Sequence, residues 1–214
     1  MSTVRSSSAS PLTITAFITP DTLASMTAYM DANPDVGCAT ARLVLEDGRL
    51  DLACRRSFPT PGAAFYRISQ LSRLFPRSKR AARYNLTYLP DDQETDIDSP
   101  CGAFMFVRRE AYEQVGGLDE RYFMYGEDLD WAFRLKAAGW RITYAPVSTV
   151  LHLKRASSRK FRGRTIRAFH DAMRIFYRTY YEARYPAWMS WLVYRAIDGR
   201  EMLELTAHRL GRAH

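Results

Sequence analysis

The 214-residue sequence has few cysteines and no long apolar run. Its three cysteines, Cys38, Cys54 and Cys101, are an odd number without metal-ligand spacing, which suggests neither a disulfide framework nor a zinc site. No apolar segment reaches the roughly 18 to 20 residues that a membrane-spanning helix needs. The polar opening MSTVRSSSAS lacks the apolar centre of a secretory signal. We therefore expect a reduced, cytoplasmic protein that is soluble or lies on a membrane surface.

The net charge of +8 is concentrated near the C-terminus. Residues 1–151 carry 17 basic and 18 acidic side chains, whereas residues 152–214 carry 14 basic and 5 acidic ones. No nucleic-acid reader motif accompanies this charge, so we expect no nucleic-acid partner. A basic, aromatic-rich tail suits an anionic membrane surface or a phosphate-bearing substrate.

Alternating strand-like and helix-like patterns predict an α/β fold. Residues 1–11 are polar and are expected to be disordered. The β-branched segment 12–18 predicts a buried strand, and Asp21 follows it at a place where it can cap a helix. Residues 38–45 and 50–54 predict a hairpin, because Asp-Gly between them supplies the turn.

Further elements follow a Pro-rich, charged segment at residues 57–98, which we interpret as a mobile insertion beside a cleft. GAFMFV at 102–107 predicts a strand, and RREAYEQV predicts a helix that ends at Gly116. A second helix is expected at 128–138. Residues 140–144 and 148–151 predict two short strands.

The C-terminal residues 164–214 predict a basic amphipathic helical tail. Apolar and aromatic side chains recur at helical spacing until Pro186 interrupts them, with arginines interleaved. One interpretation is a helix pair at the membrane interface that brings the enzyme to a lipid-linked acceptor. The alternative is a C-terminal helix packed on the core.

The adjacent acids Glu127 and Asp128 are the sharpest local feature, because they stand at a helix start after the aromatic loop RYFMYG. The helix dipole favours an ionised carboxylate in the first turn, as a general base for a hydroxyl requires. From spacing alone, a simple helix cap is the commoner role, with Asp130 and Arg134 forming an i, i+4 pair.

Two further residues are candidate metal ligands. Asp21 lies at a strand end, where it can bind a metal or serve only as an N-cap. His152 follows an apolar strand and precedes a basic loop, where it can ligate a metal or be a structural histidine.

The order of motifs TPDT, PDVG, DGRL, GAFMFVRREAYEQVGGLDERYFMYGEDLDWAFRLKAAGW and LH resembles the family 2 glycosyltransferases. The branch that it resembles most is that of rhamnosyl- and galactofuranosyl-transferases. The resemblance runs from about Phe17 to about Arg164. It implies a partial GT-A fold, a Rossmann-like mixed sheet flanked by helices, in which residues 12–163 form the acceptor and catalytic half.

The resemblance also implies roles for individual residues. Asp128 is expected to be the base that deprotonates the acceptor, with Glu127 as its catalytic neighbour. Asp21 and His152 are expected to hold Mg²⁺ or Mn²⁺, although Thr19 departs from the usual acidic or Asn position of that motif.

Substrate contacts are expected from four residues. Gly102 and Ala103 match the small residues beside the donor sugar, and Trp131 and Arg134 are predicted substrate-binding residues on the base helix. The implied reaction is an inverting, single displacement from a nucleotide-diphosphate sugar to a glycan or polyprenyl-linked acceptor in cell-surface polysaccharide synthesis.

The resemblance lacks one part, because about two nucleotide-binding βαβ units usually precede the metal motif. We therefore expect little or no transferase activity from this chain alone, and a homodimer or a complementing N-terminal half as its partner. The alternative function is a truncated, non-catalytic module that binds acceptor or membrane. In either case we expect the protein at the inner face of the cell membrane.

Overall fold

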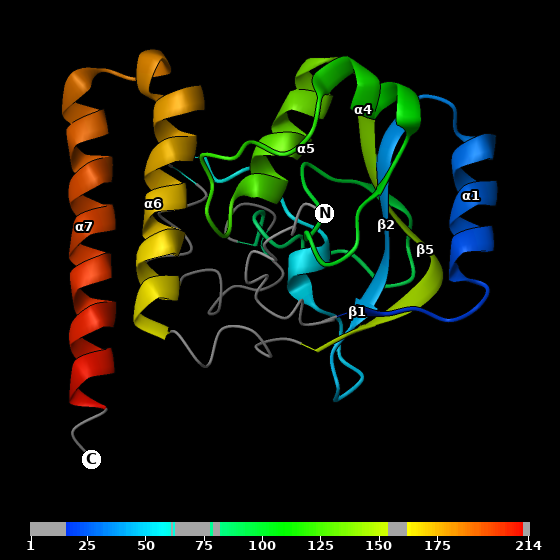
Figure 1. Ribbon diagram of the computed structural model, residues 1–214, viewed down its shortest axis with the longest axis horizontal. Helices are drawn as coiled ribbons and strands as arrows, with labels where there is room; N and C mark the ends of the chain where they lie inside the picture. The colour runs from blue at the N-terminus through cyan, green and yellow to red at the C-terminus, as the bar shows by residue number, and fades with distance from the viewer. Residues whose placement is uncertain (1–15, 61, 63–77, 79–81, 154–161, 212–214) are drawn as a thin grey trace, which may run out of the picture.

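A mixed sheet with helices on both sides forms the main body of the structure (Figure 1). The computed structural model describes residues 16–60, 62, 78, 82–153 and 162–211. The predicted α/β class and the helical tail are confirmed. The expectation of disorder at residues 1–11 falls outside the described residues.

The sheet has the strand order β1-β5-β2-β4, and β3 pairs with β5 beside this path. Strands β2 and β5 are parallel, whereas β1, β3 and β4 each pair antiparallel with a neighbour. The strands are β1 (Ala16–Phe17), β2 (Val36–Val44), β3 (Thr95–Asp96), β4 (Phe106–Val107) and β5 (Arg141–His152).

The helices form layers around this sheet. They are α1 (Thr22–Ala32), α4 (Arg109–Val115), α5 (Glu127–Ala137), α6 (Arg162–Tyr180) and α7 (Ala187–Leu210), with 3₁₀ turns at Leu52–Cys54 and Glu182–Arg184. Figure 1 shows α1 on one side of β2 and β5, α5 on the other, and α6 and α7 beyond α5.

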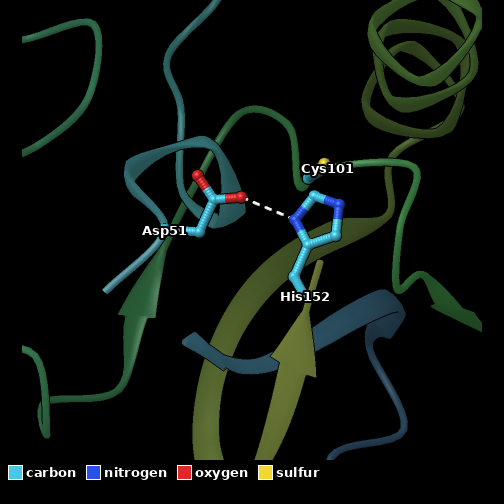
Figure 2. A group of neighbouring side chains, drawn as sticks. All are labelled: Asp51, Cys101 and His152. Carbon is cyan, nitrogen blue, oxygen red and sulfur yellow. Dashed lines mark hydrogen bonds and ion pairs between the residues drawn. The ribbon is translucent and has the colours of Figure 1, made fainter. Parts of the chain in front are cut away.

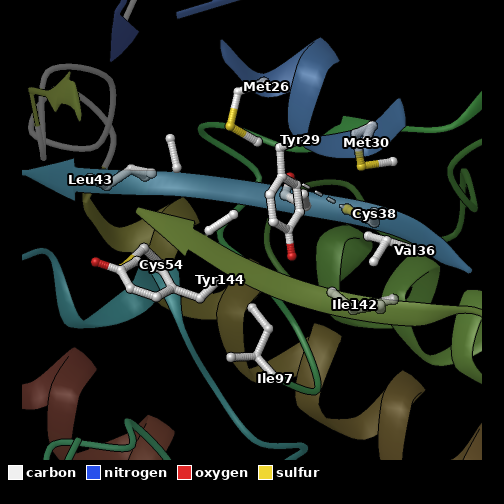
Figure 3. Packing of buried hydrophobic residues seen from close by; sticks show 14 of the residues in the cluster. Met26, Tyr29, Met30, Val36, Cys38, Leu43, Cys54, Ile97, Ile142 and Tyr144 are labelled. Carbon is white, nitrogen blue, oxygen red and sulfur yellow. Dashed lines mark hydrogen bonds between the residues drawn. The ribbon is translucent and has the colours of Figure 1, made fainter. Parts of the chain in front are cut away.

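The central strand pair carries the main core. Nearly every residue of β2 is buried, because a parallel strand covered on both faces excludes water from both. Met26, Tyr29 and Met30 of α1 cover one face (Figure 3). Ile97 and Tyr144 belong to the same buried cluster.

Of the predicted hairpin at 38–45 and 50–54, the structure contains the turn but not the second strand. The turn is confirmed, since Gly48 has φ +77° and Val44 bridges Leu50. The second strand is wrong, because residues 52–54 form a 3₁₀ turn. Asp51 stabilises this turn by accepting a hydrogen bond from the Ala53 amide at 3.0 Å.

Other strand predictions also need correction. Only Phe106–Val107 of segment 102–107 is a strand, because the chain turns before it and the Phe104 amide donates to the Cys101 carbonyl at 3.1 Å. The two strands expected at 140–144 and 148–151 are one strand, β5, with an irregularity in its pairing to β2.

The segment predicted as a mobile insertion is largely part of the core where it is described. Tyr84, Leu86 and Ile97 are buried. The fully buried Arg55 donates to the Leu89 and Pro90 carbonyls at 2.8 and 2.6 Å. The prediction is wrong for residues 82–98, because backbone carbonyls that bond a buried guanidinium are fixed in place; residues 63–77 lie outside the described part.

The two tail helices differ in their packing. α6 buries Phe176 and Tyr177, and the ring of Tyr180 stacks on Phe133 of α5 with centroids 4.0 Å apart. α7 packs on α6 and leaves Trp188 and Trp191 more than 60% exposed. None of the described helices combines the length and apolar character needed to cross a bilayer. Packing on the core therefore describes α6, and the interfacial role of α7 stays a prediction.

Gly37 allows the two central strands to approach each other. The pairing shifts between Val36 and Cys38, and a Cβ on Gly37 would lie 2.6 Å from the Trp140 Cβ. We expect Gly37→Ala to lower the free energy of unfolding by about 1 to 3 kcal/mol through overpacking, measured by urea denaturation.

The control is Gly199→Ala, because a Cβ there meets nothing within 4 Å and the residue lies inside α7. We expect this change to raise the free energy of unfolding by about 0.5 to 1 kcal/mol. Equal effects of the two substitutions would contradict the packing at Gly37.

Candidate active site

The loop before α5 places two acids at the start of that helix. Gly126 holds the N-cap position in the left-handed conformation, with φ +83°, and Tyr125 before it also has a positive φ of 68°. A Cβ on Gly126 would lie 3.0 Å from the Ala172 Cβ of α6. Since a left-handed, closely packed residue must be glycine, the sequence Tyr-Gly fixes where α5 begins.

Asp128 is held by three hydrogen bonds. Its Oδ2 accepts from Arg56 Nη2 at 2.7 Å and from the Gly102 amide at 3.0 Å. Its Oδ1 accepts from the Leu129 amide at 2.8 Å. These donors hold the carboxylate in one orientation at the N-terminal end of α5.

Arg56 is the buried partner of this acid. Its side chain and that of Asp128 are each 12% exposed. Burial is the largest single influence and acts to lower the pKa of the Arg56 guanidinium, but the charge and hydrogen bond of Asp128 together with nearby Tyr84 and Cys101 raise it overall. Arg56 also donates to the Ser99 hydroxyl and the Pro100 carbonyl, so it links Asp128 to segment 99–102.

Glu127 has a different environment from its neighbour. Its Oε2 is buried and has no hydrogen-bond partner among the described residues. Burial raises the pKa of Glu127, and the adjacent charge of Asp128 acts in the same direction. Neither acid is the N-cap, so the simple cap role that spacing favoured does not describe them.

A pocket of about 380 Å³ brings together five of the predicted site residues. Glu127, Asp128 and Trp131 line it from α5, and Gly102 and Ala103 line it from the preceding loop. A Cβ on Gly102 would lie only 3.5 Å from the Asp128 Cβ. The small residue therefore leaves space directly beside the carboxylate.

Arg134 lies outside the lining of this pocket. Its Nε donates to Asp130 at 2.8 Å, which confirms the predicted i, i+4 pair. Its two other nitrogens donate to the Val115 and Gly117 carbonyls, both at 2.7 Å. In this structure the side chain fixes the end of α4 against α5.

A second group of side chains lies near the end of β5 (Figure 2). His152 Nδ1 and Asp51 Oδ2 are 2.7 Å apart. Ligand atoms of Asp51, Cys101 and His152 all lie within 4.8 Å of one another. Asp21 is exposed at the start of α1 and does not belong to this group.

The three side chains of this group differ in how well they suit a divalent metal. A histidine that metal binds through Nε2 commonly donates Nδ1–H to a carboxylate, the arrangement that Asp51 and His152 have. Burial raises the pKa of the Cys101 thiol, which keeps it protonated, and Mg²⁺ and Mn²⁺ prefer oxygen over sulfur. Asp51 and His152 therefore fit a divalent metal, and Cys101 does not.

Sequence reasoning missed Arg56 and Asp51. Arg56 is one of 31 basic residues and has no motif of its own. Asp51 had one usable signal, because it follows the Asp-Gly turn directly and precedes a buried cysteine.

Comparison with known proteins decides the family. The model of the glycosyltransferase-like family 2 matches residues 16–169, well over half of the chain. The chain belongs to the family 2 glycosyltransferases. Its fold is a partial GT-A fold, and the resemblance drawn from the sequence is confirmed.

Two relatives of this family 2 chain are rhamnosyltransferases by name. The N-acetylglucosaminyl-diphospho-decaprenol L-rhamnosyltransferase of Mycobacterium tuberculosis is 34% identical over 143 residues, 67% of this chain and 44% of the relative. The rhamnosyltransferase WbbL of Escherichia coli is 36% identical over 86 residues, 39% of this chain and 33% of WbbL. The chain thus spans less than half the length of these relatives.

Removing one partner of the buried Arg56–Asp128 pair should strongly lower the stability of the protein. Replacing Arg56 by Leu leaves a buried carboxylate unpaired, and we expect the free energy of unfolding to fall by about 3 to 5 kcal/mol. Adding Asp128→Asn should recover part of this loss, because it removes the unpaired charge. Chemical denaturation of the three proteins measures the difference.

The control is Arg49→Leu, which breaks an exposed pair with Asp47 and should give no measurable change. If the double variant were as unstable as Arg56→Leu alone, the charge of Asp128 would not be the cause.

Proposed function

We propose that this chain carries the acceptor and base half of an inverting glycosyltransferase. The supporting observation is Asp128, a carboxylate that Arg56 holds beside the space that Gly102 leaves open. The donor is a nucleotide-diphosphate sugar, and the acceptor is a hydroxyl of a glycan or lipid-linked sugar. The nucleotide-binding half comes from a longer polypeptide or from a second chain.

Among the described residues, the hydrogen bonds of Asp128 leave one acceptor site for this reaction. A carboxylate has about four lone-pair sites, and Arg56, Gly102 and Leu129 occupy three. The free site is on Oδ1, which takes the proton of the acceptor hydroxyl. The acceptor oxygen bonds to the anomeric carbon as the bond to the diphosphate breaks, and the configuration inverts.

Arg56 and Glu127 assist this step in different ways. Arg56 holds Asp128 Oδ2 at 2.7 Å, which leaves Oδ1 for the acceptor hydroxyl. Glu127 lines the same pocket with a buried oxygen that lacks a partner among the described residues, so it can accept a bond from a second sugar hydroxyl.

A divalent cation, Mg²⁺ or Mn²⁺, fits the proposed function. His152 would hold it through Nε2 while Asp51 fixes the imidazole through Nδ1, and Asp21 is retained as a predicted ligand. When bound, the metal neutralises charge on the departing nucleoside diphosphate.

The names of the relatives support a narrower assignment of the donor sugar and the acceptor. Two of them are rhamnosyltransferases by name, which supports an L-rhamnosyl donor, and one has a diphospho-decaprenol acceptor in its name. Together with the basic tail, a lipid-linked acceptor supports a peripheral position at the inner face of the cell membrane.

Metal binding can be measured without any transfer reaction. We expect His152→Ala to abolish Mn²⁺ binding by electron paramagnetic resonance. Asp51→Asn should weaken binding about 10- to 100-fold, because the imidazole loses its orienting partner. Cys101→Ser is the control, and a large loss of affinity in that variant would assign the thiol as a ligand.

The base is tested by comparing two neighbouring acids. Asp128→Asn keeps the shape but removes the base, and we expect kcat to fall about 10²- to 10⁴-fold with little change in KM. Glu127→Gln, the matched change one residue away, should keep most of the rate. The assay uses the chain together with a donor-binding half, a nucleotide sugar and a lipid-linked acceptor.

An equal loss from Glu127→Gln would move the base to that residue. If the unaltered chain gave no transfer with the donor-binding half and Asp128→Asn left its biological effect unchanged, the chain would be the non-catalytic binding module instead.

A further inference from the structure

An apolar cavity of about 500 Å³ lies between α6 and α7. The described residues that line it are aliphatic and aromatic side chains, tyrosines included, with proline and glycine. Phe169 and Phe176 line it from α6, and Trp188 and Leu192 line it from α7. Its size falls within the range of about 300 to 1,000 Å³ that is typical of sites for small organic ligands.

The first turn of α5 separates this cavity from the reaction pocket. Glu127 and Asp128 line the reaction pocket, whereas Gly126 and Leu129 line the apolar cavity. A ligand in the cavity therefore lies one helical turn from the proposed base.

A basic groove of about 760 Å³ lies on the neighbouring face of α6. Ala172 lines both the groove and the apolar cavity. Five arginines contribute to the groove, and Arg164 among them lies over the ring of Phe123 at 5.2 Å. Arg174 is neutralised by Asp171, Asp198 and Glu201, so Arg164 and Arg167 are the better candidates for an external anion.

We infer that the apolar cavity binds the isoprenoid chain of a lipid diphosphate acceptor and that the basic groove binds its diphosphate. A cavity that is open on one side and lined by α5, α6 and α7 suits one chain, whereas adsorption to a bilayer needs only an exposed apolar face. The diphosphate supplies the negative charge that complements the arginines. This inference rests on the proposed function and identifies the acceptor class of that site.

Farnesyl diphosphate, a water-soluble isoprenoid diphosphate, is a suitable probe. Trp188 lines the cavity, so binding to the full chain can be followed by tryptophan fluorescence and confirmed by calorimetry. Farnesol and inorganic diphosphate report on the apolar cavity and the basic groove separately. No donor or metal is needed, so the outcome is independent of transfer activity.

Filling the cavity should remove this binding. Ala196 lines the cavity from α7 and is exposed, so Ala196→Trp fills space without replacing a core residue. We expect affinity for farnesyl diphosphate and farnesol to fall at least about tenfold. Ala207→Trp, the same change at an exposed position of α7 outside the cavity lining, should change affinity less than about twofold.

Reversing the groove charge should affect only the diphosphate. We expect the double variant Arg164→Glu, Arg167→Glu to weaken farnesyl diphosphate at least about tenfold and to leave farnesol binding unchanged. If Ala196→Trp failed to fold by circular dichroism, Leu192→Trp would replace it, since Leu192 also lines the cavity and is 49% exposed.

Equal binding by the Ala196 and Ala207 variants would overturn the inference. So would a protein that binds anionic vesicles but neither farnesyl diphosphate nor farnesol, because a membrane surface would then be the partner. Binding that follows the expected pattern in a chain that shows no transfer even with a donor-binding half and a nucleotide sugar would retain the inference and reject the proposed function.

Discussion

The ion pair between Arg56 and Asp128 joins three parts of the chain that are far apart in sequence. Arg56 follows the 3₁₀ turn at Leu52–Cys54, segment 99–102 supplies carbonyl and amide groups, and Asp128 comes from α5. Since a buried charge without a partner is costly, none of these parts can move independently of the others. The constraint that stabilises the fold at this point is therefore also the one that orients the proposed base.

Segment 99–102 connects this pair with the candidate metal group. The Gly102 amide donates to Asp128, while Cys101 lies beside Asp51 and His152. A shift of the peptide between Cys101 and Gly102 would therefore displace both the Asp128 carboxylate and the Cys101 side chain beside Asp51 and His152. Such coupling suits a reaction in which the acceptor loses a proton while the diphosphate leaves, because both events must occur on one sugar carbon.

Local patterns predicted the helices and much of the reaction pocket. The limits of α4 and α5 follow from Gly116, Gly126 and Gly139, whose positive φ values are encoded by residue type. Glu127 and Asp128 were found because they are neighbours in a long motif. Arg56 and Asp51 were not, because their contacts span 72 and 101 residues. The hairpin and the strand at 102–107 were overpredicted because β pairing depends on partners that a local pattern does not contain.

The first turn of α5 has polar chemistry on one side and an apolar cavity on the other. Asp128 is satisfied by Arg56 and Gly102, which lie away from the cavity, so an apolar ligand beside Leu129 does not desolvate the carboxylate further. At the same time, the close approach of Gly126 to Ala172 packs the loop before α5 against α6. One helical turn can thus place an apolar chain and the proposed base side by side, the two requirements of a transferase that works on a lipid-linked sugar.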